Sequence, residues 1–332
     1  ENGVEAIYMS SWLRYRATTL NPHVARFCRA SLTKFDLVHF YGLYDLLGPV
    51  VSYHCRRQRI PYVIEPMGMY RPIDRSIQLK RMWHRTVGAP FWRNASRVIA
   101  TSELEFQELL AGGVPRGKLL MRYNGVDTDF YGSPSPRGQF RAKWGIPPNE
   151  PLILFLSRLI PRKGADILIE AFAHVCSKSG RLLIAGPEGE AGYEHFLKTC
   201  AKRAGVSARV LFTGALYDME KKAALGDADV FVLPSRYENF ANVAAEAMAR
   251  GVPVIISNMC GISSLVEGRA GLVIAPEKDA LVNALLRLME DKALYERLKE
   301  GCRQVARELA WDRLTESMEE YYIEILKEKV SV

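Results

Sequence analysis

The sequence has 332 residues, of which 48% are hydrophobic and 25% are charged. This composition is typical of a folded globular protein that is large enough for two domains, and it excludes a disordered chain. No apolar run reaches the roughly eighteen residues that a membrane span requires.

The net charge of +8 is distributed unevenly. Residues 1–150 contain 21 lysines and arginines against 12 aspartates and glutamates, whereas residues 151–332 contain 24 against 25. A basic first half predicts an anionic partner, such as a membrane surface, a phosphorylated molecule or a nucleic acid. Nucleic acid is the least favoured, because no recognition helix, zinc finger or aromatic nucleic-acid motif accompanies the charge.

The six cysteines and six histidines are scattered along the chain, and no Cys-x-x-Cys pair occurs. This pattern indicates free thiols in a reducing compartment and disfavours a disulfide framework or a structural zinc site. The sequence therefore predicts a cytoplasmic protein without a metal site, a cofactor or a signal peptide.

In the first half of the chain, short apolar runs alternate with helical segments. We expect strands at residues 4–9, 36–40, 62–64 and 97–102, and helices at residues 21–32 and 46–59. Ser102 is expected to cap the helix that follows, with Glu105 at the capping-box position. This alternation is typical of an open parallel sheet.

Residues 71–97 form the most basic stretch, with seven arginines and lysines interspersed with Trp83, Phe91 and Trp92. A basic helix that carries aromatic residues can lie on an anionic bilayer surface. The alternative is a solvated helix whose tryptophans pack on the sheet. Both interpretations stay open. Peripheral contact with the inner face of the membrane and a purely structural role are expected about equally.

The middle of the chain is predicted to join two domains. Proline-rich and glycine-rich stretches at residues 132–136 and 147–148 are typical of a linker. Asp127 and Asp129 form an Asp-x-Asp pattern that binds a metal in other proteins, but capping of a turn is the favoured interpretation here. We expect a first domain at residues 1–145, a second at 146–310 and a terminal amphipathic helix at 311–332.

The second half continues the alternation of strands and helices. The expected strands are residues 152–156, 181–185, 210–214, 229–233, 254–256 and 271–274. The expected helices are residues 165–176, 241–250, 278–289, 293–309 and 313–327. Ligands of parallel sheets bind at the carboxyl ends of the strands, so the loops after these strands are the candidate site.

Two glutamates follow the expected strand at 229–233. Glu238 precedes the helix at 241–250, and Glu246 lies two turns into it, on the order of 12 Å further along the axis. Each carboxylate can accept hydrogen bonds from a pair of hydroxyl groups, and the backbone N–H groups between them can attract a phosphate. The alternative is a glutamate that complements the helix dipole and a second, exposed glutamate.

Two cations follow the expected strand at 152–156. Arg158 and Lys163 lie five residues apart in a strand-to-helix loop that ends at Gly164, and such a pair suits a diphosphate. The alternative is an exposed basic loop. A glycine turn at residues 186–189 follows the next strand.

These loops together resemble the donor-binding signature of the retaining GT-B glycosyltransferases of family four, the glycosyl transferases of group 1. The resemblance lies in the Arg-x-x-x-x-Lys-Gly loop, in the two glutamates with seven residues between them, and in the glycine and proline that end the helix, Gly251 and Pro253. Asn239 and Ala241 stand where the family usually has glycines.

The resemblance implies an α/β protein of the GT-B fold. Two Rossmann-like domains would face each other with parallel sheets across a cleft, and the last helix would pack back on the first domain. The first domain is expected to be truncated, without the usual N-terminal strand and glycine-rich loop. The implied reaction is metal-independent transfer of a hexose, with retention, from a UDP- or GDP-sugar to a hydroxyl group of a carbohydrate or lipid-linked acceptor.

The resemblance also implies roles for individual residues. Arg158 and Lys163 would stabilise the departing diphosphate, and Glu238 would hold hydroxyl groups of the donor sugar. The donor-binding positions would be Gly164, Gly186, Asn239, Phe240, Ala241, Asn242, Val243 and Glu246, the last one at the ribose. The positions on the acceptor side would be His39, Tyr41, Met67 and Gly68.

The acceptor-side positions come from two stretches that are similar to His-x-His-Gly-Leu-Trp and Pro-His-Gly-Met in a subset of the family. Tyr41 and Met67 stand where those relatives have histidines, so no catalytic histidine is assigned. His39 lies on an apolar strand and is expected to be packed. Two alternatives to transfer stay open: a donor-binding protein that is weakly active or inactive, and a nucleotide-sugar epimerase on the same fold.

Overall fold

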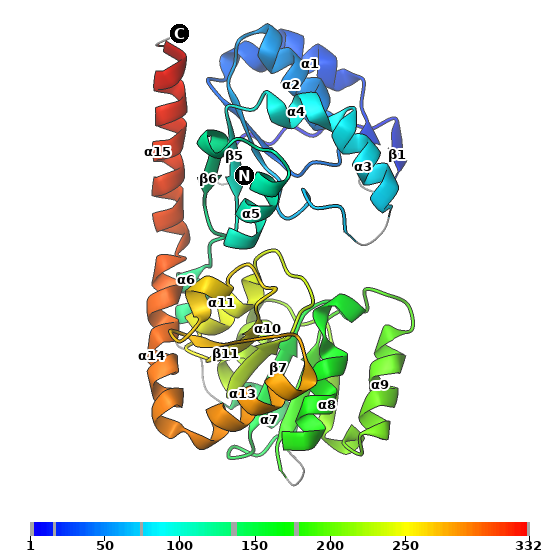
Figure 1. Cartoon of the computed structure of the whole chain (residues 1–332), viewed down its shortest axis with the longest axis vertical. Helices are drawn as coiled ribbons and strands as arrows, with labels where there is room; N and C mark the ends of the chain where they lie inside the picture. Colours follow the sequence, from blue (N-terminus) through cyan, green and yellow to red (C-terminus); the bar gives the residue numbers. More distant parts are fainter. Residues whose placement is uncertain (1–2, 16–17, 74–75, 134–137, 176–178, 331–332) are drawn as a thin grey trace. The chain divides into compact units, whose positions relative to one another are not determined.

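The computed structural model describes residues 3–15, 18–73, 76–133, 138–175 and 179–330 (Figure 1). The chain forms two compact units, one made of Glu1–Arg122 with Thr315–Val332 and the other of Tyr123–Leu314. Each unit is an α/β structure with its own parallel sheet, as the GT-B fold requires. Part of the expected linker, residues 134–136, lies outside the described residues.

The first unit contains a four-stranded parallel sheet in the order β3-β4-β5-β6. Its strands are β3 (Val38–Tyr41), β4 (Tyr62–Glu65), β5 (Arg97–Ala100) and β6 (Leu119–Met121). The helices of this unit are α1 (His23–Ser31), α2 (Leu47–Arg57), α3 (Ile77–Arg85), α4 (Gly88–Arg93), α5 (Glu103–Ala111) and most of α15 (Trp311–Val330). Short 3-10 turns occur at η1 (Leu32–Lys34) and η2 (Arg116–Lys118).

Both faces of the four-stranded sheet are covered. Successive side chains of a strand point to opposite faces. Tyr62 and Ile64 accordingly join the larger core of the unit, whereas Val63 between them packs with Ile99 and with Ile325 of α15. The apolar face of α15 therefore completes the core of the first unit.

Two expectations for the first unit were wrong. Residues 4–9 form no strand, and the strands that do form nearby are the short antiparallel pair β1 (Leu13–Tyr15) and β2 (Thr18–Leu20). The basic stretch at 71–97 is not one helix, because the chain breaks between α3 and α4. At that break Gly88 packs so closely that a Cβ there would lie 2.9 Å from the Trp83 ring. Arg75, one of the basic residues, lies outside the described residues.

The cap of α5 was predicted in part. Ser102 accepts a hydrogen bond from the backbone N–H of Glu105, as expected for an N-cap. The Glu105 carboxylate, however, accepts from the N–H (2.9 Å) and the hydroxyl (2.8 Å) of Thr101 and from the N–H of Gly68 (2.5 Å). Instead of closing a reciprocal capping box, this buried carboxylate ties the end of β5 to the loop after β4. Burial raises the pKa of Glu105.

The second unit contains a six-stranded parallel sheet in the order β12-β11-β10-β7-β8-β9. Its strands are β7 (Leu152–Leu156), β8 (Arg181–Ala185), β9 (Val210–Gly214), β10 (Val230–Leu233), β11 (Val254–Ser257) and β12 (Gly271–Ile274). Its helices are α6 (Thr128–Gly132), α7 (Gln139–Lys143), α8 (Ala165–Val175), α9 (Tyr193–Arg203), α10 (Asp218–Asp227), α11 (Asn242–Ala249), α12 (Ser263–Val266), α13 (Lys278–Glu290) and α14 (Lys292–Glu308). Turns η3 (Pro161–Lys163) and η4 (Ser207–Arg209) precede α8 and β9.

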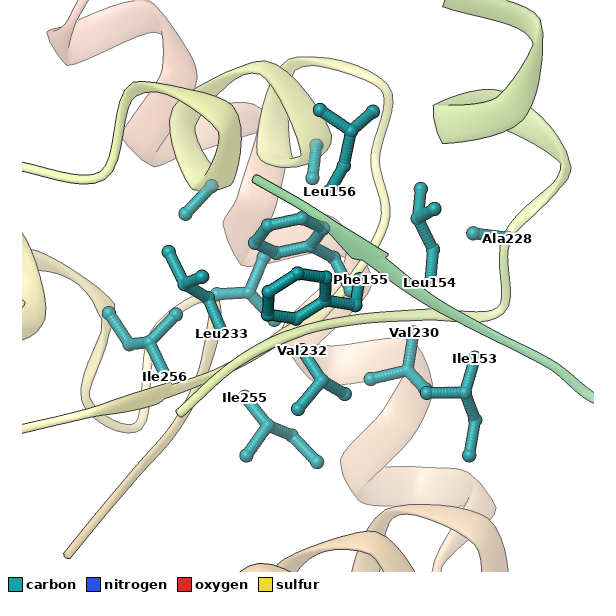
Figure 2. Close-up of a cluster of buried hydrophobic side chains, with 14 of the residues drawn as sticks. Ile153, Leu154, Phe155, Leu156, Ala228, Val230, Val232, Leu233, Ile255 and Ile256 are labelled. Carbon is teal, nitrogen blue, oxygen red and sulfur yellow. The ribbon is translucent and has the colours of Figure 1, made fainter. Parts of the chain in front are cut away.

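The central strands of this sheet are buried on both faces, which explains their continuous apolar sequence. Every residue of β7, β10 and β11 is buried. Figure 2 shows their side chains gathered along the three adjacent strands. The strands of this unit and its helices α8, α11, α13 and α14 match the expected ranges to within two residues, whereas α6, α7, α9, α10 and α12 were not expected. Asp127 caps α6 by accepting from the N–H of Phe130 at 2.7 Å, which confirms the capping interpretation.

The direction of strand progression reverses between β7 and β10. From β7 the chain continues through β8 to β9 on one side, and from β10 through β11 to β12 on the other. Such a reversal opens a crevice at the carboxyl ends of the two strands, where ligands bind. In the described part of the chain, none of the helices combines the length and apolarity needed to cross a membrane.

Candidate active site

The loops after β7 and β10 meet at the point where the strand order reverses. Gly164 has a φ of +75°, and a Cβ there would lie 2.2 Å from the carbonyl oxygen of Pro234. The N–H of Arg236 donates to the carbonyl of Arg162 at 2.8 Å. Gly164 is therefore required both for its left-handed backbone and for the close approach of the two loops.

An ion pair links these two loops. The Nζ of Lys163 contacts the Oε2 of Glu238, and the two side chains are only 8% and 19% exposed. From the sequence we expected Lys163 at the diphosphate and Glu238 at the donor sugar; the ion pair between them was not predicted. The two charges compensate each other, which lowers the cost of burying them.

Glu238 is held by a loop that the sequence analysis did not identify. Its N–H donates to the carbonyl of Met259 at 2.9 Å, and its carbonyl accepts from the N–H of Gly261 at 2.9 Å. Between these two residues, Cys260 is buried and burial raises its pKa to about 12, so its thiol stays protonated. The loop after β11 therefore fixes the backbone of Glu238 from both sides.

The loop after β8 closes against the loop that carries Arg158. Gly186 has a φ of +144°, and a Cβ there would lie 1.8 Å from the carbonyl oxygen of Ser157. The N–H of Leu159 donates to the carbonyl of Pro187 at 2.9 Å, next to this contact. Arg158 itself is exposed, and its side chain makes no hydrogen bond or ion pair within the described ranges. It is available to an anion at this edge of the sheet.

Five of the expected donor-binding positions, residues 239–243, lie just before α11 and in its first turn. Phe240 is 2% exposed, so its ring belongs to the core and only its backbone borders the site. Ala241 has φ +81° and ψ +60°, a left-handed conformation that favours glycine. Asn242 accepts a hydrogen bond from the side-chain amide of Asn124 at 3.0 Å. Asn239 precedes the turn, and Val243 follows it on the helix.

Glu246 lies in a second ion pair. Its Oε2 is 2.5 Å from the Nζ of Lys221 on α10. Tyr131 on α6 lies near the same carboxylate: burial, and after it the charge of Glu246, raise the pKa of its hydroxyl. The sequence analysis missed both partners, because residues on three different helices share no local spacing pattern.

The expected acceptor-side residues lie at the carboxyl ends of β3 and β4 in the first unit. Tyr41 and Met67 are 65% and 45% exposed, and Gly68 has a φ of +76°. His39 is packed, as expected: its Nδ1 lies 2.6 Å from the Tyr322 hydroxyl, and its ring stacks on Tyr41.

A buried carboxylate, Glu65, completes this group. It lies 2.6 Å from the Nη2 of Arg122 and 3.5 Å from the Nε2 of His39. The sequence analysis named neither Glu65 nor Arg122 for this site. Arg122 compensates the charge of Glu65 at the edge of the sheet at which Tyr41 and Met67 are exposed.

Comparison with known proteins identifies the family. Residues 136–305 match the family described as Glycosyl transferases group 1, and residues 2–130 match Glycosyltransferase Family 4. The chain is a family 4 glycosyltransferase. A D-inositol 3-phosphate glycosyltransferase of Streptomyces bingchenggensis is 31% identical to it over 88% of this chain and 67% of that protein. One from Xylanimonas cellulosilytica is 31% identical over 62% of this chain and 51% of that protein.

Solved structures of glycosyltransferases share the fold. Sucrose-phosphate synthase from Thermosynechococcus elongatus matches with a TM-score of 0.75 and 26% identity, over 92% of this chain and 78% of that one. HepE of Anabaena, solved with UDP and glucose, matches with a TM-score of 0.78 and 24% identity, over 92% of this chain and 82% of that one. These similarities establish the GT-B fold for this family 4 glycosyltransferase. The chain spans about half the length of several curated relatives.

Proposed function

We propose that this glycosyltransferase transfers a hexose from a nucleotide sugar to a hydroxyl group of its acceptor, with retention at the anomeric carbon and without a metal ion. The observation that carries the proposal is the ion pair of Lys163 and Glu238 at the reversal of the strand order, in a chain of family 4. Retention is supported by the resemblance of these loops to the retaining members of the family.

The residues of the site would act on the leaving group. As the bond between the anomeric carbon and the diphosphate oxygen breaks, negative charge develops on the diphosphate. Arg158 and Lys163 would stabilise that charge, Arg158 through paired hydrogen bonds and Lys163 as a compact cation. The acceptor oxygen bonds to the same carbon, and its proton leaves with the released nucleotide diphosphate.

Glu238 would change partners when the donor binds. A phosphate oxygen of the donor competes with Glu238 for the Lys163 ammonium, and the carboxylate that is released can accept hydrogen bonds from the sugar hydroxyls. Glu246, further along α11, would accept from the ribose. In this proposal the donor replaces the internal ion pairs with its own charges and hydroxyl groups.

We propose UDP as the nucleotide and a phosphorylated carbohydrate or a lipid-linked sugar as the acceptor. The name of the Streptomyces relative and the UDP in the HepE structure support these choices, with a GDP-sugar as the alternative donor. The excess of basic residues in the first half of the chain is favourable for an anionic acceptor. Tyr41, Met67 and Gly68 would lie on the acceptor side.

We also propose peripheral contact of a cytoplasmic enzyme with the inner face of a membrane through α3. Ile77, Leu79 and Met82 of this helix are 38%, 55% and 56% exposed. Arg81 and Arg85 on the same helix are exposed, and α3 contains no buried residue. Apolar side chains next to cations suit a surface of anionic lipid.

The test is a panel of donors with the purified chain. UDP-, GDP- and ADP-sugars are compared by thermal shift, and the donor that binds is then incubated with phosphorylated and lipid-linked acceptors. Release of the nucleotide diphosphate together with an α-linked product from an α-linked donor supports the proposal. Binding without product would indicate an inactive donor-binding protein, and an epimer formed from donor alone would indicate an epimerase.

A further inference from the structure

The carboxylate of Glu246 belongs to a cluster of three groups from three helices. Lys221 on α10 places its Nζ 2.5 Å from the Oε2 of Glu246, and Tyr131 on α6 lies close enough to the same carboxylate for Glu246 to raise the pKa of its hydroxyl. The Lys221 ammonium also lies 5.6 Å from the centre of the Tyr131 ring. The side chains of Lys221 and Glu246 are 19% and 16% exposed, so the pair is mostly removed from water.

The two partners have different consequences for Glu246. The Lys221 ammonium compensates the charge of the carboxylate, which would otherwise be costly at this depth. The Tyr131 hydroxyl lies near the same carboxylate, and burial together with the charge of Glu246 raises its pKa, so it is a neutral hydrogen-bond donor beside Glu246. An ionised carboxylate has about four lone-pair positions, so directions remain for two further donors.

We propose that Lys221 and Tyr131 are positioning residues that orient the Glu246 carboxylate toward both hydroxyl groups of a ribose, and thereby make the donor site select ribonucleotides over 2′-deoxyribonucleotides. This inference rests on the proposed function, which places a nucleotide at Glu246. Two adjacent hydroxyl groups bind best to a fixed, ionised carboxylate, because both hydrogen bonds are then charge-assisted.

A purely structural role of the cluster would have a different signature. If Lys221 only tied α10 to α11, its removal would weaken all nucleotides to the same extent or none of them. If Lys221 positions Glu246, its removal should weaken the binding of a nucleotide with both ribose hydroxyl groups more than the binding of the 2′-deoxy form. The preference for UDP over 2′-deoxy-UDP therefore separates the two roles.

The experiment measures Kd by calorimetry for UDP, 2′-deoxy-UDP, GDP and 2′-deoxy-GDP with the full chain, and compares the preferred nucleotide with its 2′-deoxy form. The wild type is expected to prefer the ribonucleotide by about tenfold or more, the worth of one hydrogen bond to a charged group. Lys221→Met is expected to reduce this preference to less than about threefold, mainly by weakening the ribonucleotide. Tyr131→Phe is expected to reduce it partially, and Lys221→Arg to retain it.

Lys143→Met is the matched control. Lys143 on α7 pairs at 2.5 Å with Glu220, which lies on the same helix as Lys221, α10. The side chain of Lys143 is 63% exposed and does not contact Glu246. This variant should bind all four nucleotides like the wild type. If Lys221→Met and Tyr131→Phe keep the full preference of the wild type, the positioning role is wrong while the proposed function stands. If the wild type binds no nucleotide, or does not distinguish the deoxy form, the ribose assignment itself is overturned.

Discussion

Each of the two glutamates in the site is paired with a lysine from another element. Glu238 contacts Lys163 and Glu246 contacts Lys221. From the sequence we expected the cations to bind the diphosphate of the donor, and the glutamates to bind the hydroxyl groups of its sugar and ribose. The structure instead balances the charge of each acid with a lysine from another element, which lowers the cost of burying it.

Lys163 and Arg158 should differ in how they affect stability. Lys163→Met leaves the buried carboxylate of Glu238 without its cation, so it should lower both the melting temperature and kcat/KM, the latter by about 100-fold or more. Arg158→Ala changes an exposed side chain and should lower kcat/KM by about 10- to 100-fold without a change in melting temperature. Nucleotide-release kinetics and thermal unfolding measure the two effects.

The control is Arg303→Ala, which removes an exposed arginine of α14 whose ion pair among the described residues is with Glu300, three residues earlier. It should leave both quantities unchanged. Full activity of Arg158→Ala would refute the role of this arginine at the diphosphate.

Residue types in the site were predictable where a local pattern carried them. The loops of Arg158, Lys163 and Glu238 could be placed at one edge because each follows a continuous apolar strand. Gly164 and Gly186 could be named as candidate donor-binding residues from the sequence. The reason that glycine is required at both positions is close contact with a loop distant in sequence, which the sequence does not show. Lys221 could not be predicted, because its partner lies on another helix. Ala241 stands where the family usually has glycine and has a left-handed backbone. The sequence alone does not reveal that backbone conformation.

Long and fully buried helices and strands were predicted from the sequence more accurately than short or partly exposed ones. The central strands of the second unit, β7, β10 and β11, are buried on both faces and were predicted well. The three-residue strand Leu119–Met121 was missed, since it is too short and too partially buried to produce a periodic signal. The break between α3 and α4 was missed because the packing of Gly88 on Trp83 outweighs the local helical pattern.

Helix α3 should control binding to lipid. Met82→Glu places a negative charge among the exposed apolar and basic residues of this helix, so it should reduce binding to vesicles of phosphatidylcholine and phosphatidylglycerol by about tenfold. Co-sedimentation at low salt measures the bound fraction. The chain should not bind vesicles of phosphatidylcholine alone.

Met289→Glu is the matched control for this element. Met289 is 43% exposed on α13 of the second unit, so the same change is made on another surface. It should leave vesicle binding unchanged. Equal binding by the wild type and the Met82 variant would contradict the membrane role and favour a solvated helix.

At the scale of the whole molecule, the last helix connects the end of the chain to the first unit. After α14 the chain continues into α15, and from Thr315 onward it belongs to the same unit as the first 122 residues. Met318 and Ile325 pack with Val63 and Ile99, and Arg97 contacts Glu328. The second unit is instead one continuous segment with its own core.

This organisation predicts that stability and donor binding can be changed separately. Ile325 is 3% exposed, and Ile325→Ala should destabilise the first unit by about 2–5 kcal/mol through lost contacts and a residual cavity. Ile323 is 46% exposed on the same helix, so Ile323→Ala should change stability by no more than about 0.5 kcal/mol. Because the proposed donor residues all belong to the second unit, neither variant should alter the Kd for UDP. Calorimetric unfolding with and without UDP measures this. In Ile325→Ala the unfolding transition whose midpoint UDP raises, that of the second unit, should keep its midpoint, while the midpoint of the other transition moves down. A loss of UDP affinity in this variant would show that donor binding depends on the first unit.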